Sequence, residues 1–140
     1  NEIQLVYHGT VYSKKNSKRI ITNWRTGKPS IISNKNAKNQ EVQMAWELCG
    51  QAREQGWTCD WEEEKDHTPE FEIEIHIWHK DRRRRDLDNQ ATAILDALVA
   101  AQIIPDDSVE WLPRLTVQYR GIDKEDPRAL IIVRERKWEV

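Results

Sequence analysis

Hydrophobic residues recur along this chain with two different periods, and each period predicts one kind of element. Residues 71–78 alternate strictly between apolar and polar side chains, which is the pattern of a strand with one buried face. Residues 2–11 are rich in β-forming side chains and predict a first strand. Residues 111–120 and 129–138 predict two closing strands, separated by a charged loop.

Two other segments follow the helical period. Residues 36–55 end before Gly56, and the apolar positions at helical spacing within them are Val42, Ala45, Trp46, Cys49 and Ala52. Residues 88–102 predict a second helix, whose apolar stripe is Leu87, Ala91, Ile94, Leu95, Leu98 and Ala101. We expect core packing for the tryptophans at apolar positions or element ends, which are Trp46, Trp57 and Trp78.

The order of these elements, β-loop-α-β-α-β-β, predicts an α+β fold with a mixed sheet and two packed helices. The length of 140 residues suits a single domain, residues 1–140, with its own core. Residues 12–35 predict a long basic loop, in which Ile20–Trp24 and Ser30–Ile32 can form a short hairpin.

Several classes of protein do not fit this composition. No apolar run approaches the roughly 20 residues that span a bilayer, so we do not expect an integral membrane protein. No signal-peptide pattern is visible, and the two cysteines fit neither a disulfide scaffold nor a zinc motif. These observations predict a cytoplasmic protein.

The net charge of −2 conceals a strong segregation of charge along the chain. Between residues 10 and 40 there is no acidic residue but eight basic ones, Lys14, Lys15, Lys18, Arg19, Arg25, Lys28, Lys35 and Lys38. Residues 60–74 carry eight acidic residues and a single lysine, Lys65. Such segregation predicts a face that binds a polyanion, whatever the average charge.

The segment from residue 82 to residue 89 carries the most specific chemistry. The four consecutive arginines Arg82–Arg85 form a strong phosphate-binding element. Asp86 and Asp88 follow at the start of a predicted helix, where two carboxylates can hold a hard cation such as Mg²⁺. A second acidic pair, Asp106 and Asp107, follows that helix.

Each of these features also has an ordinary structural interpretation. An aspartate at a helix start is usually a cap, an arginine run is usually solvated surface, and Asp-Asp after a proline is usually a turn. A helix over 88–101 carries the chain roughly 20 Å away from the first acidic pair. The two pairs therefore meet only if the chain doubles straight back, or if they meet across a subunit interface.

These residues resemble the signature of a known family. The run Asp81-Arg-Arg-Arg-Arg-Asp-Leu-Asp-Asn, then Leu95-Asp-Ala-Leu, then Asp106-Asp107, is similar to that of the RusA family of Holliday-junction resolvases. Ser13-Lys-Lys-Asn16 with Arg19 is similar, less specifically, to an N-terminal element of that family. The resemblance implies a small, homodimeric, Mg²⁺-dependent endonuclease, with Mn²⁺ as an alternative ion and no small-molecule cofactor.

The resemblance also implies roles for individual residues. Asp86, Asp88 and Asp107 correspond to the essential metal-binding carboxylates, with Asp106 beside them. We expect metal-assisted hydrolysis of a DNA phosphodiester bond, with two symmetric cuts on a four-way junction during recombination and repair. The residues expected to position branched DNA through its phosphates are Lys14, Lys15, Asn16, Lys18, Arg19, Arg82, Arg83, Arg84 and Arg85.

The sequence departs from the family at one functional position. The family has an important lysine four residues past the second aspartate, and this chain has Thr92 there. One alternative is therefore a junction-binding protein with weak or lost catalysis. Another is a protein-interaction domain whose basic loop binds an acidic partner. A zinc site at His76 with acidic neighbours is also open, although an exposed histidine on a strand face is commoner.

Overall fold

Four strands form one mixed sheet in the spatial order β1-β6-β4-β5. They are β1 (Glu2–His8), β4 (Glu70–His79), β5 (Arg114–Ile122) and β6 (Arg128–Arg136). The central strand β6 runs antiparallel to both of its neighbours, whereas β5 runs parallel to β4. This computed structural model describes residues 1–13, 18–23, 28–33, 35–57 and 69–136.

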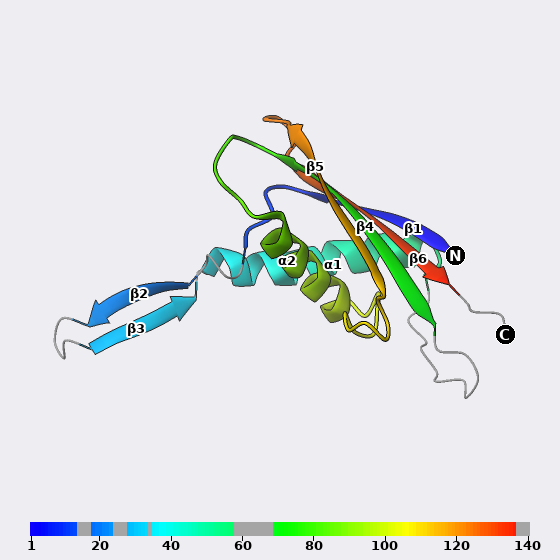
Figure 1. Cartoon of the computed structure of the whole chain (residues 1–140), viewed down its shortest axis with the longest axis horizontal. Helices are drawn as coiled ribbons and strands as arrows, with labels where there is room; N and C mark the ends of the chain where they lie inside the picture. The colour runs from blue at the N-terminus through cyan, green and yellow to red at the C-terminus, as the bar shows by residue number, and fades with distance from the viewer. Residues whose placement is uncertain (14–17, 24–27, 34, 58–68, 137–140) are drawn as a thin grey trace.

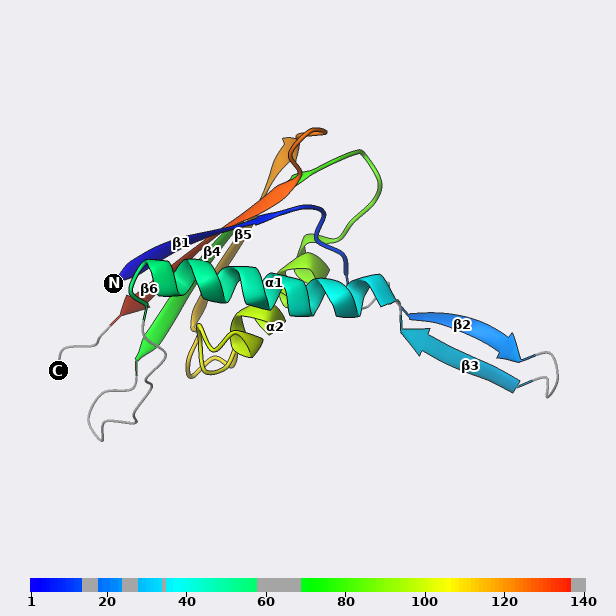
Figure 2. The same ribbon diagram turned by 180° about the vertical axis from the view of Figure 1, so that it is seen from behind.

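Two helices, α1 (Lys35–Glu54) and α2 (Leu87–Ala100), cover the same face of the sheet (Figures 1 and 2). The predicted alternation in β4 places four buried side chains against them, namely Phe71, Ile73, Ile75 and Ile77. Helix α2 connects the parallel strands β4 and β5, so it runs back along the sheet against their direction. The predicted α+β architecture of a single domain is confirmed, and so is the predicted stripe of α2 apart from half-buried Leu87.

The basic segment forms a separate two-stranded hairpin, built from β2 (Lys18–Asn23) and β3 (Lys28–Ser33). The hairpin projects past the amino-terminal end of α1, away from the sheet (Figures 1 and 2). The sequence predicted a short hairpin inside a loop here, and the strands extend further than expected toward residue 18.

The predicted apolar stripe of α1 is wrong in part. The helix buries positions four residues apart, Gln40, Met44, Leu48 and Ala52, against the sheet and α2. By contrast, Val42 is 71% exposed and Trp46 is 82% exposed, so Trp46 does not belong to the core. Two apolar stripes run along α1, and hydrophobicity alone could not tell which of them faces the sheet.

Of the other two tryptophans, Trp57 confirms the prediction of core packing, whereas Trp78 lies outside the core. Trp57 is buried and donates its indole N–H to the Ile103 carbonyl at 2.9 Å. Trp78 is half-buried on the sheet face opposite the helices, where the Arg128 guanidinium lies over its ring at 4.0 Å, so the prediction of core packing is wrong for Trp78 because strand alternation turns it away from the core. Among the helices of the described residues, none is long and apolar enough to cross a membrane.

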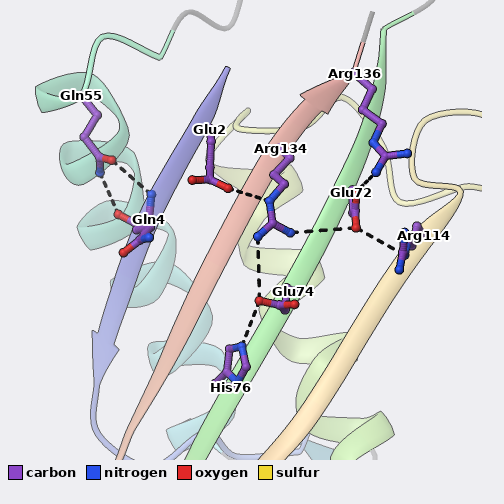
Figure 3. Close-up of polar contacts among 9 residues, drawn as sticks. All are labelled: Glu2, Gln4, Gln55, Glu72, Glu74, His76, Arg114, Arg134 and Arg136. Atoms are coloured by element: carbon purple, nitrogen blue, oxygen red, sulfur yellow. Dashed lines mark hydrogen bonds and ion pairs between the residues drawn. The ribbon is translucent and has the colours of Figure 1, made fainter. Parts of the chain in front are cut away.

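Side chains of α1 close one edge of the sheet. The Gln51 amide both donates to the Val6 carbonyl and accepts from the Val6 N–H, each at 2.8 Å. The Gln55 amide bonds Gln4 in the same way, at 2.8 and 3.1 Å (Figure 3). These two amides take the place of a further strand at Gln4 and Val6, so the outward-facing backbone groups of these two residues are satisfied.

The exposure pattern of α1 predicts very different effects for two large side chains. Leu48→Ala should lower the free energy of unfolding by about 2–5 kcal/mol, because it leaves a cavity in the core. Trp46→Ala should change it by less than about 0.5 kcal/mol, because the ring is exposed. Urea unfolding of both variants measures the difference, and an equal loss would contradict the orientation of α1.

Candidate functional site

The first acidic pair lies at the amino-terminal end of α2. Asp86 occupies the N-cap position with an extended backbone, φ −92° and ψ 125°, yet its carboxylate makes no capping hydrogen bond. Its nearest amide partner, Asn89 Nδ2, lies at 3.5 Å, and the side chain is 46% exposed. Asp88, in the first turn, is also exposed. Both carboxylates are therefore accessible to solvent, and the Asp86 carboxylate makes no capping hydrogen bond to the helix.

A buried polar contact fixes this end of α2 to the sheet. His79 at the end of β4 is 8% exposed, and its Nε2 lies 2.9 Å from the Gln90 side-chain oxygen. The Gln90 amide in turn donates to the Val11 carbonyl at 3.0 Å. The His79 carbonyl accepts from the Asp123 N–H at 2.8 Å, which attaches the β5–β6 turn. Three separate segments thus hold the helix start in place.

The arginine run connects β4 to α2 and divides into two parts. Arg82, Arg83 and Arg84 are exposed, and Arg84 lies 3.8 Å from an Asp86 oxygen. Arg85 is different, because its guanidinium donates to the Asp81 carboxylate at 2.7 Å. This hydrogen bond is the main reason that the pKa of Asp81 lies below its usual value. The structure therefore leaves three arginines facing solvent beside Asp86.

The second acidic pair lies in the turn after α2. The helix ends in a Schellman motif, in which Gln102 has a positive φ of 58° and the Ile103 N–H bonds the Leu98 carbonyl. Asp106 and Asp107 follow and are exposed. The Asp107 N–H and the Ser108 hydroxyl hydrogen-bond to the Asp106 carboxylate and lower its pKa.

The two acidic pairs lie at opposite ends of the domain within one chain. Helix α2 has 14 residues, a length of about 20 Å at 1.5 Å per residue. The first pair adjoins His79 at the end of β4, whereas the turn after the second pair bonds Phe71 at the start of β4 through the Trp111 carbonyl. No group of three metal-binding side chains occurs among the residues that the structure describes. The chain does not double back, so one copy does not unite Asp86, Asp88 and Asp107.

Thr92 lies one helical turn after Asp88 and is exposed. Its hydroxyl donates to the Asp88 carbonyl at 2.9 Å, so it contacts the backbone of the acidic turn. The side chain has the position of the lysine that the resemblance implies, but it carries no charge.

Some of the expected DNA contacts lie outside the described residues, namely Lys14, Lys15 and Asn16. Lys18 and Arg19 lie at the start of β2, on the projecting hairpin. The hairpin therefore carries at least part of the basic segment away from the sheet (Figure 1).

The sequence did not reveal the charged network on the uncovered face of the sheet. Glu72 lies within 2.7–3.3 Å of the guanidinium groups of Arg114 and Arg136, and Arg134 pairs with Glu2 at 2.6 Å (Figure 3). His76 Nε2 lies 3.1 Å from a Glu74 oxygen, a contact that lowers the pKa of Glu74. Charged side chains alternate along these strands in the sequence. Only the register between neighbouring strands, however, determines which of the charged side chains form pairs.

The comparisons with known proteins do not assign the chain to a family. No model of a known protein family matches the chain, and no curated protein matches it significantly.

The contact between Arg85 and Asp81 predicts a pH-dependent contribution to stability. A carboxylate whose pKa is lowered by folding stabilises the fold above its unfolded pKa of about 3.9, and the effect is lost as the pH falls through the folded pKa. Asp81→Asn should therefore lower the urea midpoint at neutral pH. The difference from the unmodified protein should disappear in strong acid.

The matched control is Glu110→Gln, which removes an exposed charge from the turn before β5. It should leave the midpoint nearly unchanged at either pH. A difference for Asp81→Asn that is constant across the acidic range would contradict an electrostatic contribution of this carboxylate.

Proposed function

We propose that this protein is a cytoplasmic, metal-dependent endonuclease that cuts branched DNA, in the manner of the RusA-like resolvases that its sequence resembles. The observation that carries the proposal is the start of α2. Two accessible carboxylates, Asp86 and Asp88, lie there beside three exposed arginines, and neither carboxylate is used as a cap. A phosphodiester and a divalent cation are the two partners that such a set of side chains suits.

The donor set fits Mg²⁺, with Mn²⁺ as the alternative. Mg²⁺ prefers oxygen ligands and is usually held by one or two carboxylates together with water and phosphate oxygens. Asp86 and Asp88 would supply the two carboxylates, and their exposure leaves room for a phosphate. When bound, the ion would activate water for attack on phosphorus and neutralise charge at the phosphate.

A homodimer would supply the third carboxylate. Asp107 lies at the far end of α2 from Asp86 and Asp88, so a second copy in the antiparallel orientation is the way to combine them. Asp106, with its lowered pKa, would remain ionised beside Asp107. Two copies related by a twofold axis would form two equivalent sites, which suits paired cuts on a four-way junction.

Positively charged segments would orient the DNA. The exposed Arg82, Arg83 and Arg84 would contact phosphates next to the acidic pair, without reading the sequence. The β2–β3 hairpin, with Lys18 and Arg19 at its start, would reach an arm of the junction away from the sheet (Figure 2). Lys14, Lys15 and Asn16 precede it in the chain and are proposed to act with it. Arg85 would act mainly by fixing this segment through Asp81.

A second candidate function is binding of junctions with weak or no cleavage. The observation that favours it is Thr92, whose hydroxyl is engaged with the Asp88 carbonyl and whose side chain offers no positive charge. The two functions share a binding surface and differ in turnover.

The main test is cleavage of a synthetic four-way junction with and without Mg²⁺. The unmodified chain should nick the junction only with the ion, and linear duplex much less. Asp86→Asn should abolish nicking while junction binding is retained, because one negative charge near the phosphate is removed. The control Glu110→Gln should cut normally, and undiminished cutting by Asp86→Asn would refute the assignment.

Mixing two inactive variants tests whether each site is built from two chains. Asp86→Asn and Asp107→Asn should each be inactive alone. If the carboxylates come from different chains, a mixed dimer retains one intact site, so equal mixing should restore about a quarter of the sites. Nicking of the junction after subunit exchange is the measurement. Sites contained within one chain would give no restoration.

Thr92→Lys separates the two candidate functions. If the absent positive charge limits turnover, the variant should increase the rate of nicking at saturating Mg²⁺, without a comparable change in junction affinity. Thr92→Met is the control, because it lengthens the side chain without adding charge. Equal rates for all three proteins would mean that this position does not limit turnover.

A further inference from the structure

The strands of the four-stranded sheet carry five arginines, and four of them are paired with carboxylates. Each of the four has a guanidinium nitrogen 2.6–3.3 Å from a carboxylate oxygen, namely Arg114 and Arg136 with Glu72, Arg128 with Asp123, and Arg134 with Glu2. The fifth, Arg120, is exposed and has no ion pair among the residues that the structure describes. Its positive charge is therefore available to an anionic ligand.

A β-bulge near the end of β5 determines where Arg120 lies. Ile77 pairs with Tyr119 and Trp78 pairs with Gly121, so Arg120 is an extra residue that no residue of β4 opposes. Gly121 has a φ of 116°, a backbone conformation that glycine adopts readily and other residues rarely do. Bulges of this kind redirect a side chain and are common next to functional sites.

The Arg120 side chain lies over the uncovered face of the sheet. Its guanidinium carbon is 6.0 Å from the centre of the Trp78 ring, within the range of a cation–π contact. The Arg128 guanidinium lies over the same ring at 4.0 Å, but Asp123 and Asp126 balance its charge at 2.8 and 3.6 Å. The charge that remains unbalanced at this ring is that of Arg120.

This position adjoins the start of α2. The end of β5 and the segment that connects β4 to α2 leave the sheet at the same end (Figure 1). The strand β4 continues from Trp78 into the exposed arginines 82–84 and then into α2. The Tyr119 ring, next to Arg120 in the chain, lies 4.8 Å from the ring of His79, which holds the start of α2. Arg120 therefore lies at the same end of the domain as the first acidic pair.

We propose that Arg120 binds a phosphate of the DNA, as a positioning residue additional to Arg82, Arg83 and Arg84. This proposal rests on the proposed function, because it takes the ligand to be DNA. The DNA backbone would pass from the start of α2 over the end of β4 and onto the uncovered face of the sheet. A guanidinium can bond two oxygens of one phosphate, and such a contact reads no base sequence.

The neighbouring charges favour a nucleic acid over a single small anion. Arg120 and the exposed arginines 82–84 lie on successive parts of one end of the domain. Four cations spread in this way suit a ligand that repeats its negative charge along a continuous backbone, as DNA does.

The salt dependence of junction binding tests the contact. A fluorescent four-way junction is titrated without Mg²⁺ at roughly 50 to 200 mM salt, the range in which phosphate contacts strongly affect affinity. Arg120→Gln should make the slope of log affinity against log salt shallower by about 0.9, the contribution of one phosphate contact. Its affinity should fall about eightfold at about 0.1 M salt. Arg120→Lys keeps the charge and should keep most of the slope.

Arg53→Gln is the matched control. Arg53, in the last turn of α1, is also exposed and also lacks an ion pair within the described part of the chain, so its loss changes the net charge equally. Its salt slope should equal that of the unmodified chain. Arg120→Gln should keep the native circular dichroism, because the side chain is exposed. An unchanged slope for Arg120→Gln, or an equal reduction for Arg53→Gln, would overturn the proposal.

Binding is measured without Mg²⁺, so the result is separate from cleavage. If the chain cuts junctions but Arg120→Gln binds them with an unchanged salt slope, the contact is refuted and the proposed function stands. If the slope becomes shallower in a chain that never cuts with Mg²⁺, the contact stands and the nuclease is refuted.

Discussion

The fixed length of α2 is the constraint on which the rest of the structure depends. The helix is held at its start by the contact between His79 and Gln90 and at its end by the Schellman motif at Gln102. Both anchors are buried or backbone contacts, so the helix acts as a rigid spacer of about 20 Å between two acidic pairs. A small domain with its carboxylates divided in this way cannot assemble them alone. Whatever the chain does with them involves a ligand at one end only, or a partner.

The start of α2 is built in an unusual way for a helix that begins with an aspartate. An N-cap carboxylate normally accepts from the first free N–H groups and is thereby fixed. Here Asp86 has the backbone of an N-cap but not the side-chain bond, and Arg84 lies 3.8 Å from its carboxylate. The arrangement leaves the helix end less well satisfied and the carboxylate more accessible. This departure from good capping supports the proposal that Asp86 has a functional role.

Much of the fold could be predicted from the sequence, and the failures have physical reasons. Strict alternation identified β4, and the apolar stripe of α2 was sufficient to assign its buried face. The stripe of α1 was ambiguous, because Val42 and Trp46 repeat at the same spacing as Met44 and Leu48. For the site, the sequence placed Asp86 and Asp88 at the helix start. It could not decide whether Asp107 returns to them, because that depends on the path of the turn after Gln102. The hydrogen bonds of Gln51, Gln55 and Gln90 to backbone groups could not be predicted either, because no periodic pattern in the sequence marks a glutamine that bonds the backbone.

The sealed β1 edge sets an upper limit on the size of any assembly made by strand addition. A sheet with two open edges can add copies indefinitely and grow into a fibre. In this chain the amides of Gln51 and Gln55 already occupy the backbone hydrogen-bonding groups of Val6 and Gln4 at the β1 edge. Strand addition is then confined to the other side of the sheet, and growth ends once that side is occupied. Two glutamines on α1 thus protect the chain from polymerisation through both edges of its sheet.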